Sequence, residues 1–476
     1  MSREKKLIKN TAVVAMGQVG TKFISFFLLP LYTALLSTEE YGTVDLLNTY
    51  VSLLLPLIFL QLDQAVFRFL IDNRKKNKER NKLISTVLIT VTVQAVVYLL
   101  FFGIIGRFID NQYKYFLATN VVAAMFSSVL LQVSRGLGDN FTYSLGSLVS
   151  GAGTIILNVI FLAIFRWGAY GMLTASLLSN TFCSVFVFSR LKLFQMVSVS
   201  NWKKQTLKDL WKYSIPLVPN ALSWWIISAS DRTIVTHFLG VAANGIYSAS
   251  NKFSAIVITV FSIFNLTWTE SASMYISDKD SSEYFTNIIN VTIKLFTSIS
   301  LLVISVMPFV FGYLITGESF ATAYYQIPIL MMATLFNIIV SLFGSIYVAL
   351  KKSNEIAKTS IYSAVINIAI NILLINYIGL FAASISTFIS YFVMSIYRYF
   401  DIQKYVKIRI DYKYILSILP IVFTSVLTYY FGSFYIKAIV LLSVIIVSYI
   451  FNKNLISQLI NLILNKKKKK KYLGFK

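Results

Sequence analysis

The sequence predicts an all-α fold, a polytopic transmembrane helical bundle of about 14 helices. The chain of 476 residues is 57% hydrophobic and only 13% charged, and its mean hydropathy of +0.71 is too high for a soluble domain with a polar surface. Uncharged runs also reach the roughly 20 residues that a helix needs to cross a bilayer core. They include Leu83–Gly106, Phe116–Ser134, Phe141–Phe165, Trp167–Ser189 and Leu295–Thr316.

Continuous apolar runs favour helices over a transmembrane barrel, whose strands would show short alternating segments. No cleavable signal peptide is indicated before the first span, so we expect residues 1–9 to be retained. The expected spans are 9–36, 42–70, 83–106, 115–134, 141–165, 167–189, 213–238, 244–269, 288–315, 325–350, 359–376, 379–397, 414–432 and 434–452.

The distribution of basic residues predicts an even number of spans with both termini in the cytoplasm. Lys and Arg collect on cytoplasmic loops of membrane proteins. With the amino terminus inside, the outer loops hold only Arg107, Lys114, Arg166 and Lys437 of the 43 basic residues. Cationic inner loops therefore explain the net charge of +24, and nucleic acid is not an expected partner. The basic run 466–471 follows an amphipathic segment, so we expect it at the membrane surface.

Two short sequence correspondences suggest that the first six spans are repeated in spans seven to twelve. The turn Leu36–Gly42 matches Leu239–Gly245, and Asn158 with the following Gly171–Ser176 matches Asn371 with Gly379–Ser384. A six-span repeat keeps its orientation, which places two pseudo-symmetric lobes around a central cavity. We expect an N-terminal six-helix lobe (1–190), a cytoplasmic linker (191–212), a C-terminal six-helix lobe (213–400) and two additional helices with a basic tail (401–476).

Charged residues inside the spans are the candidate functional residues, because ionisable groups at membrane depth are costly and usually face a cavity or a partner. Asp231 and Arg232 are adjacent on one helix, so they cannot share a face and at least one needs a partner elsewhere. Asp63 and Arg68 either pair with each other near the interface or contact substrate. The candidate substrate-binding residues are Lys22, Asp63, Arg68, Asp231, Arg232 and Lys252.

Four segments carry a recognisable pattern: Lys9–Gly17, Leu36–Gly42, Leu62–Phe69 and Ser230–Arg232. With the layout of the whole chain, they resemble the Wzx-type polysaccharide flippases of the multidrug/oligosaccharidyl-lipid/polysaccharide (MOP) exporter superfamily, which also contains MATE exporters. The similarity covers roughly residues 5–400 and lies in the whole-chain layout more than in any single motif.

The resemblance implies two six-helix lobes, a cationic cavity and alternating access. Its expected activity is export of undecaprenyl-diphosphate-linked oligosaccharide repeat units across the bacterial cytoplasmic membrane, for capsule, exopolysaccharide or O-antigen synthesis. Guanidinium and ammonium groups would complement the diphosphate head group. The expected partners are this lipid-linked glycan, the bilayer, and a polysaccharide polymerase and glycosyltransferases. No cofactor is expected, and a coupling ion, Na⁺ or H⁺, is left open.

Two other functions compete with the flippase interpretation. A membrane glycosyltransferase or polymerase would be an enzyme, but glycosyl chemistry needs paired carboxylates or a metal. The predicted outer loops are short, and the sequence has one histidine, His237, and one cysteine, Cys183. We therefore expect no catalytic residues and no metal site. An ion-coupled drug exporter would need buried carboxylates in the first lobe, where Asp45 and Asp63 are the candidates.

Overall fold

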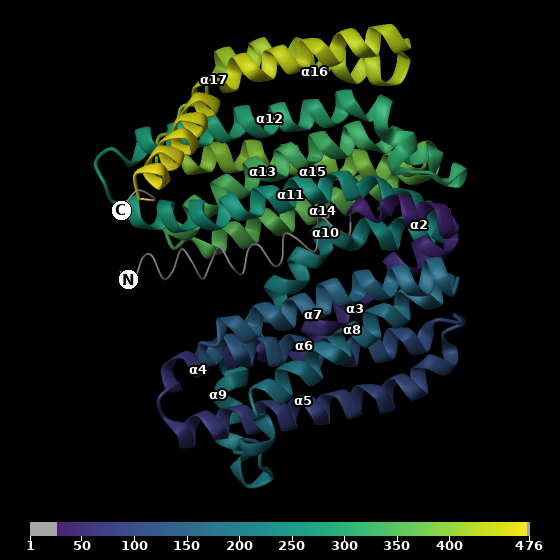
Figure 1. The fold of residues 1–476 in the computed structure, drawn as a ribbon, viewed down its shortest axis with the longest axis vertical. Coiled ribbons are helices and arrows are strands. Elements are labelled where there is room, and N and C mark those ends of the chain that lie inside the picture. The colour runs from purple at the N-terminus through teal and green to yellow at the C-terminus, as the bar shows by residue number, and fades with distance from the viewer. Residues whose placement is uncertain (1–25, 474–476) are drawn as a thin grey trace. The chain divides into compact units, whose positions relative to one another are not determined.

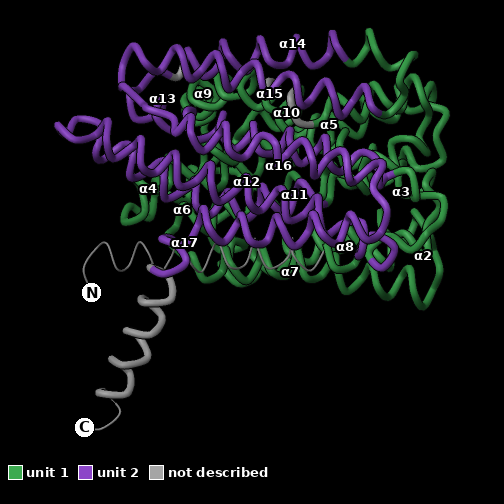
Figure 2. Tube along the Cα trace, turned by 90° about the horizontal axis from the view of Figure 1, so that it is seen from above, with its two compact units in different colours: residues 1–252, 314–322, 371–380 green, residues 253–313, 323–370, 381–476 purple. Residues whose placement is uncertain are grey.

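The structure, a computed structural model, describes residues 26–473, apart from the side chains of 223, 227, 228, 353 and 458–473. The described residues form helices and turns and contain no strand. The predicted all-α class is therefore confirmed. The chain divides into two compact units, which Figure 2 shows in two colours.

Unit 1 consists of residues 1–252, 314–322 and 371–380. Its long helices lie side by side along a common direction (Figure 1). Unit 1 contains α2 (Leu29–Leu35), α3 (Thr38–Phe59), α4 (Leu62–Asn73), α5 (Asn77–Ile105), α6 (Lys114–Leu137), α7 (Asn140–Val159), α8 (Gly168–Arg190), α9 (Lys204–Ser214), α10 (Val218–Leu239) and the beginning of α11 (Val241–Tyr275).

Unit 2 consists of residues 253–313, 323–370 and 381–476. It contains the rest of α11 and most of α14, whose last turns belong to unit 1. Its helices are α12 (Ser281–Leu314), α13 (Ile327–Ala349), α14 (Ser353–Ile378), α15 (Leu380–Ile402), α16 (Tyr412–Phe431) and α17 (Phe434–Leu473). These units do not coincide with the predicted lobes, since α10 groups with unit 1. The division into two six-helix lobes stays a prediction.

Eleven helices of the described residues are long and apolar enough to cross a membrane. They correspond to eleven of the predicted spans. Two further predicted spans are the helices α10 and α15, of 22 and 23 residues. Most of the first predicted span lies outside the described residues. The chain is thus a multi-pass membrane protein, and fourteen remains an approximate count.

The second predicted span, 42–70, is not one continuous helix. Pro56 lies in the last turn of α3, and Leu60 and Gln61 follow with left-handed backbone angles (φ of 54° and 55°). Proline removes a helical hydrogen bond, and the left-handed conformation is unfavourable for residues with a Cβ atom. The chain therefore breaks at residues 60–61, and α4 begins a new helix at Leu62.

The core of unit 1 explains how α4, α5 and α6 hold together. Apolar side chains that recur at helical spacing on each helix meet in one buried cluster. Fully buried members include Val66 on α4, Val87 on α5 and Val129 on α6. Since lipid is as apolar as these side chains, close packing rather than exclusion of water stabilises the contact. This cluster sets the positions of Asp63 and Ser128.

In unit 2, Asp411 caps the start of α16. Its carboxylate accepts hydrogen bonds from Lys294 Nζ (2.7 Å) and from the backbone N–H of Tyr414 (3.1 Å). The lysine bond and then the Tyr414 N–H lower the pKa of Asp411 below its usual value. A lowered pKa adds stability above the unfolded-state pKa of about 3.9, and that stability is lost as the pH falls through the lowered value.

Asp411→Ala is expected to lower the free energy of unfolding by about 1 kcal/mol at neutral pH, because the cap of α16 is lost. Detergent-solubilised protein unfolded by heat at several pH values measures the effect. The difference from wild type should shrink as Asp411 becomes protonated. Asp72→Ala, at an exposed acid, is the matched control. An equal effect of the two substitutions would contradict the capping role.

Candidate functional site

The two repeat-related turns meet in unit 1. Gly42 is the fifth residue of α3 and Gly245 is the fifth residue of α11. A Cβ atom on Gly42 would lie 2.1 Å from the carbonyl oxygen of Val241, and one on Gly245 would lie 2.0 Å from that of Thr38. Asn244 Nδ2 donates a hydrogen bond to the Gly42 carbonyl (2.9 Å). Glycine thus lets the two backbones touch at this crossing.

An ion pair lies one turn further along α3. Arg232 Nε on α10 donates to Asp45 Oδ2 at 2.7 Å, and the two side chains are 21% and 19% exposed. Trp225 on α10 also donates its Nε1–H to the carbonyl oxygen of Thr49 on α3 (3.0 Å). The sequence predicted neither contact. Arg232 is therefore paired with an acid in this structure.

Asp231 uses partners on other helices. It is 4% exposed, and it accepts hydrogen bonds from the Tyr247 hydroxyl on α11 (3.1 Å) and from Asn371 Nδ2 on α14 (3.0 Å). The expectation that at least one of the adjacent residues Asp231 and Arg232 needs a partner elsewhere is confirmed. Both oxygens of this buried carboxylate thus accept hydrogen bonds from neutral side chains, one on α11 and one on α14.

The two asparagines of the predicted repeat bind equivalent helices. Asn158 on α7 donates to the hydroxyl of Tyr32 on α2 (3.0 Å). Asn371 on α14 donates to Asp231 on α10. The first pair joins the fifth and first predicted spans, and the second joins the eleventh and seventh. This correspondence supports the internal duplication.

Lys252 on α11 is partly buried and lies close enough to Asp45 to interact with its charge. No ion pair with Lys252 occurs among the described residues. Lys22 lies outside the described residues, so its predicted position next to these groups stays a prediction. The four described charges, Asp45, Asp231, Arg232 and Lys252, sum to zero.

The predicted alternative that Asp63 pairs with Arg68 is wrong. Arg68 Nη1 donates instead to Asp72 at 2.7 Å, and these side chains are 49% and 62% exposed. Asp63 is 8% exposed and accepts from Ser128 Oγ (3.1 Å) and Gln64 Nε2 (3.2 Å). Asp63 and Arg68 therefore have separate environments, and substrate contact by either stays a prediction.

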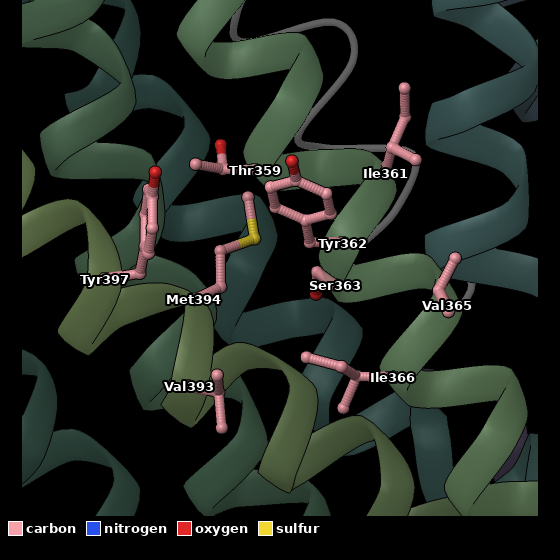
Figure 3. A pocket seen from close by; sticks show the side chains of 9 residues that line it. All are labelled: Thr359, Ile361, Tyr362, Ser363, Val365, Ile366, Val393, Met394 and Tyr397. Carbon is pink, nitrogen blue, oxygen red and sulfur yellow. The ribbon is translucent and has the colours of Figure 1, made fainter.

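In unit 2, α14 and α15 enclose a groove of about 580 Å³. Figure 3 shows side chains from both helices around it, with Met394 close to Tyr362. The lining carries no charged residue, which suits hydrocarbon better than a charged head group. Within residues 26–473, no group of three potential metal-binding side chains occurs.

The sequence analysis missed Arg398 on α15 of unit 2, because it lies one residue beyond a predicted span. The side chain is only 2% exposed. Its guanidinium donates to Thr359 Oγ1 (3.0 and 2.8 Å) and to the carbonyl oxygen of Val340 (2.9 Å), and it lies 5.8 Å from the centre of the Tyr347 ring. Arg398 thus joins α13, α14 and α15 through neutral groups.

Solved structures of transporters share this fold. The lipid II flippase MurJ in an inward closed conformation has a TM-score of 0.67 and 15% identity, covering 94% of this chain and 100% of that one. An inward-facing multidrug resistance MATE family transporter of the MOP superfamily has a TM-score of 0.66 and 13% identity, covering 83% and 98%. Identities this low establish the fold alone.

Sequence comparison adds relatives and a family. An uncharacterized membrane protein of Methanocaldococcus jannaschii is 23% identical over 84% of this chain and 99% of its own length. A probable low-salt glycan biosynthesis flippase of Haloferax volcanii is 24% identical over 45% of this chain and 46% of its own length. The family described as "Polysaccharide biosynthesis protein" matches residues 7–269, more than half of the chain. The relatives and neighbours with a named activity are flippases and transporters, not enzymes. This chain is a multi-pass membrane protein and belongs to the polysaccharide biosynthesis protein family.

Proposed function

We propose that the protein is a flippase for undecaprenyl-diphosphate-linked oligosaccharides. It moves repeat units from the inner to the outer leaflet of the bacterial cytoplasmic membrane for capsule, exopolysaccharide or O-antigen synthesis. Both termini lie in the cytoplasm, and a polymerase and glycosyltransferases use or supply the lipid-linked glycan. The family membership supports the substrate class, and the fold supports transport.

The observation that carries the proposal is the ion pair of Arg232 and Asp45, which joins two predicted membrane-spanning helices and stays about one-fifth exposed. Isolated charges are costly at membrane depth, so a partly exposed ion pair there indicates a polar path. A diphosphate is a stronger bidentate acceptor for a guanidinium than one carboxylate. The head group therefore displaces Asp45 from Arg232 as it passes, and Lys252 adds a second positive charge.

In this mechanism the contact of Gly42 with Gly245 closes the outer end of the path. Both glycines lie near the starts of their helices, which the predicted topology assigns to the extracytoplasmic side. Separation of α3 from α11 opens that side, and renewed contact closes it. The remaining candidate groups, Lys22, Asp63, Arg68 and Asp231, are proposed to line or support the central cavity, with alternating access to the two leaflets.

Arg232→Ala and Lys252→Ala are each expected to reduce glycan export at least about tenfold, since one charge-assisted hydrogen bond contributes about 1.5–3 kcal/mol. Surface polysaccharide is measured in the native host, with the protein level determined by immunoblot. Lys358→Ala is the matched control, because Lys358 is exposed and pairs with Glu355 on its own helix. Normal surface polysaccharide in both test variants would contradict the assignment of these two residues.

A double variant separates substrate binding from the loss of a structural pair. In Arg232→Ala alone, Asp45 is left without its counter-ion, which destabilises the protein by itself. In Asp45→Ala with Arg232→Ala, neither charge is left unpaired. Export should stay low in the double variant if Arg232 binds the head group. Recovery of export would show that the pair is structural.

A further inference from the structure

The helix break at residues 60–61 places a carboxylic acid in an unusual environment. Asp63 is the second residue of α4, directly after the two left-handed residues Leu60 and Gln61. The predicted second span places this break at membrane depth. A buried acid at such a position needs a counter-ion, a set of hydrogen bonds or a proton.

The side-chain hydrogen bonds of Asp63 reach only one of its oxygens. Oδ2 accepts from Ser128 Oγ on α6 and from Gln64 Nε2. Oδ1 is buried and has no hydrogen-bond partner among the described residues. No lysine, arginine or histidine in this part of the chain forms an ion pair with Asp63. The ionised carboxylate therefore has one buried oxygen with no side-chain donor, and protonation of that oxygen removes its negative charge.

Among the described residues, no charged group on the helices packed against α4 forms an ion pair with Asp63. Helix α4 packs against α5, α6 and α9. On α6, Arg135 is seven residues from Ser128, about 10 Å along the helix, and contacts the ring of Phe67. On α4, Arg68 binds Asp72. The other titratable groups of these helices are Lys78, Glu79, Arg80, Lys82 and Tyr98 on α5, Lys114 and Tyr115 on α6, and Lys204, Lys208, Asp209, Lys212 and Tyr213 on α9.

The surroundings of Asp63 favour a proton over a metal cation. Sodium would need several oxygen lone pairs around it, as other hard cations do. Both side chains that contact Asp63 present hydrogens to it instead. The unpartnered Oδ1 has almost no accessible surface, which leaves no room for a hydrated ion, whereas a proton needs no volume.

We propose that Asp63 is a proton-binding site that is loaded and unloaded during the transport cycle. A hydronium ion transfers its proton to Oδ1, an O–H bond forms, water is released and the charge of the side chain changes from −1 to 0. The N-terminus of α4 stabilises the ionised form, and burial disfavours it. Opening of the break at residues 60–61 exposes the carboxyl to water and lets the proton exchange. The link to transport rests on the proposed flippase function, but the site itself does not.

Infrared difference spectroscopy tests the site without any substrate. Purified full-length protein in liposomes is titrated with acid and base, and the carbonyl stretch of protonated carboxyl groups is recorded. Wild type should show a band that appears on acidification and is lost in Asp63→Asn. Asp72→Asn, at an exposed acid on the same helix, should keep the band. Asp63→Glu should restore it at a shifted position.

Three outcomes would overturn the proton site. The first is a band that is the same in Asp63→Asn and in wild type. The second is the absence of the band from wild type. The third is a spectral change on adding sodium at constant pH that equals the change produced by alkali. Asparagine resembles the neutral acid in shape, so Asp63→Asn should keep the thermal stability of wild type. Loss of folding in that variant would show that the ionised form is structural and would also contradict the proposal.

A transport measurement separates this inference from the proposed function. Liposomes containing the protein and an undecaprenyl-diphosphate-linked oligosaccharide are given a pH gradient. Wild type should respond to the gradient at least threefold more strongly than Asp63→Asn. If the infrared band behaves as expected and wild type moves no lipid-linked glycan, the proposed function fails and the proton site stands. If transport occurs and the band does not depend on Asp63, the proton site fails and the proposed function stands.

Discussion

Gly42→Val is expected to separate α3 from α11 and to reduce export by roughly tenfold or more, because small residues let these helices touch. A Cβ atom on Gly42 would lie 2.1 Å from the Val241 oxygen and 2.7 Å from the Gly245 nitrogen. Both atoms belong to the backbone, so no change of rotamer can relieve the overlap. The helices must move apart, and the hydrogen bond from Asn244 to the Gly42 carbonyl is then stretched or lost.

Thiol labelling measures this separation directly. Ser248, on α11, is 1% exposed, and Ser248→Cys should react slowly with a membrane-impermeant reagent in the otherwise wild-type protein. Adding Gly42→Val should raise the labelling rate at least tenfold. Gly103→Val on α5 is the matched control, because a Cβ atom there meets nothing within 4 Å. The native Cys183 is buried and contributes little labelling.

Gly245→Val is expected to act in the same way, since its Cβ atom would lie 2.0 Å from the Thr38 oxygen. If the two glycines form the outer closure, each variant should raise labelling and reduce export, and the two substitutions together should add little. Slow labelling with normal export in Gly42→Val would show that the helices accommodate the side chain and that the contact is not required for the cycle.

The fold was predictable because each element depends on local composition. The run Leu83–Gly106 has no charged residue, and the structure places helix α5 over it. The break after Pro56 was harder to predict. Leu60 and Gln61 adopt left-handed angles although neither is Gly or Asn, which are the residues that signal such a conformation.

The candidate site could be predicted only where the positions of residues along one helix decide in which directions their side chains point. Asp231 and Arg232 point in different directions on any helix, and they do bind different helices. Asp63 and Arg68 are five residues apart, which is about 140° around a helix. Asp72 is four residues from Arg68 and lies nearly on the same face, so the ion pair forms there. The partners of Arg232 and Arg398 depend on which helices pack together, which one sequence does not specify.

Arg398 provides the second large effect, and the variant that keeps the charge should be the more damaging. Arg398→Lys retains a buried cation, but its single nitrogen cannot occupy the separate positions from which the guanidinium donates to Thr359 and to the Val340 carbonyl. Arg398→Met removes the charge together with its desolvation cost. Replacing a buried charge by an apolar side chain is often close to neutral, whereas a poorly solvated charge is not.

We therefore expect Arg398→Lys to lower the free energy of unfolding by roughly 2–3 kcal/mol, and Arg398→Met by about 1 kcal/mol or less. Apparent unfolding temperatures of detergent-solubilised protein give the order, and Arg409→Lys at an exposed position is the control. If Arg398→Met were the less stable variant, the volume of the side chain would matter more than its hydrogen bonds. If the predicted order holds, the planar donor group is what joins α13, α14 and α15, and a charge at this position is tolerated only because neutral oxygens surround it.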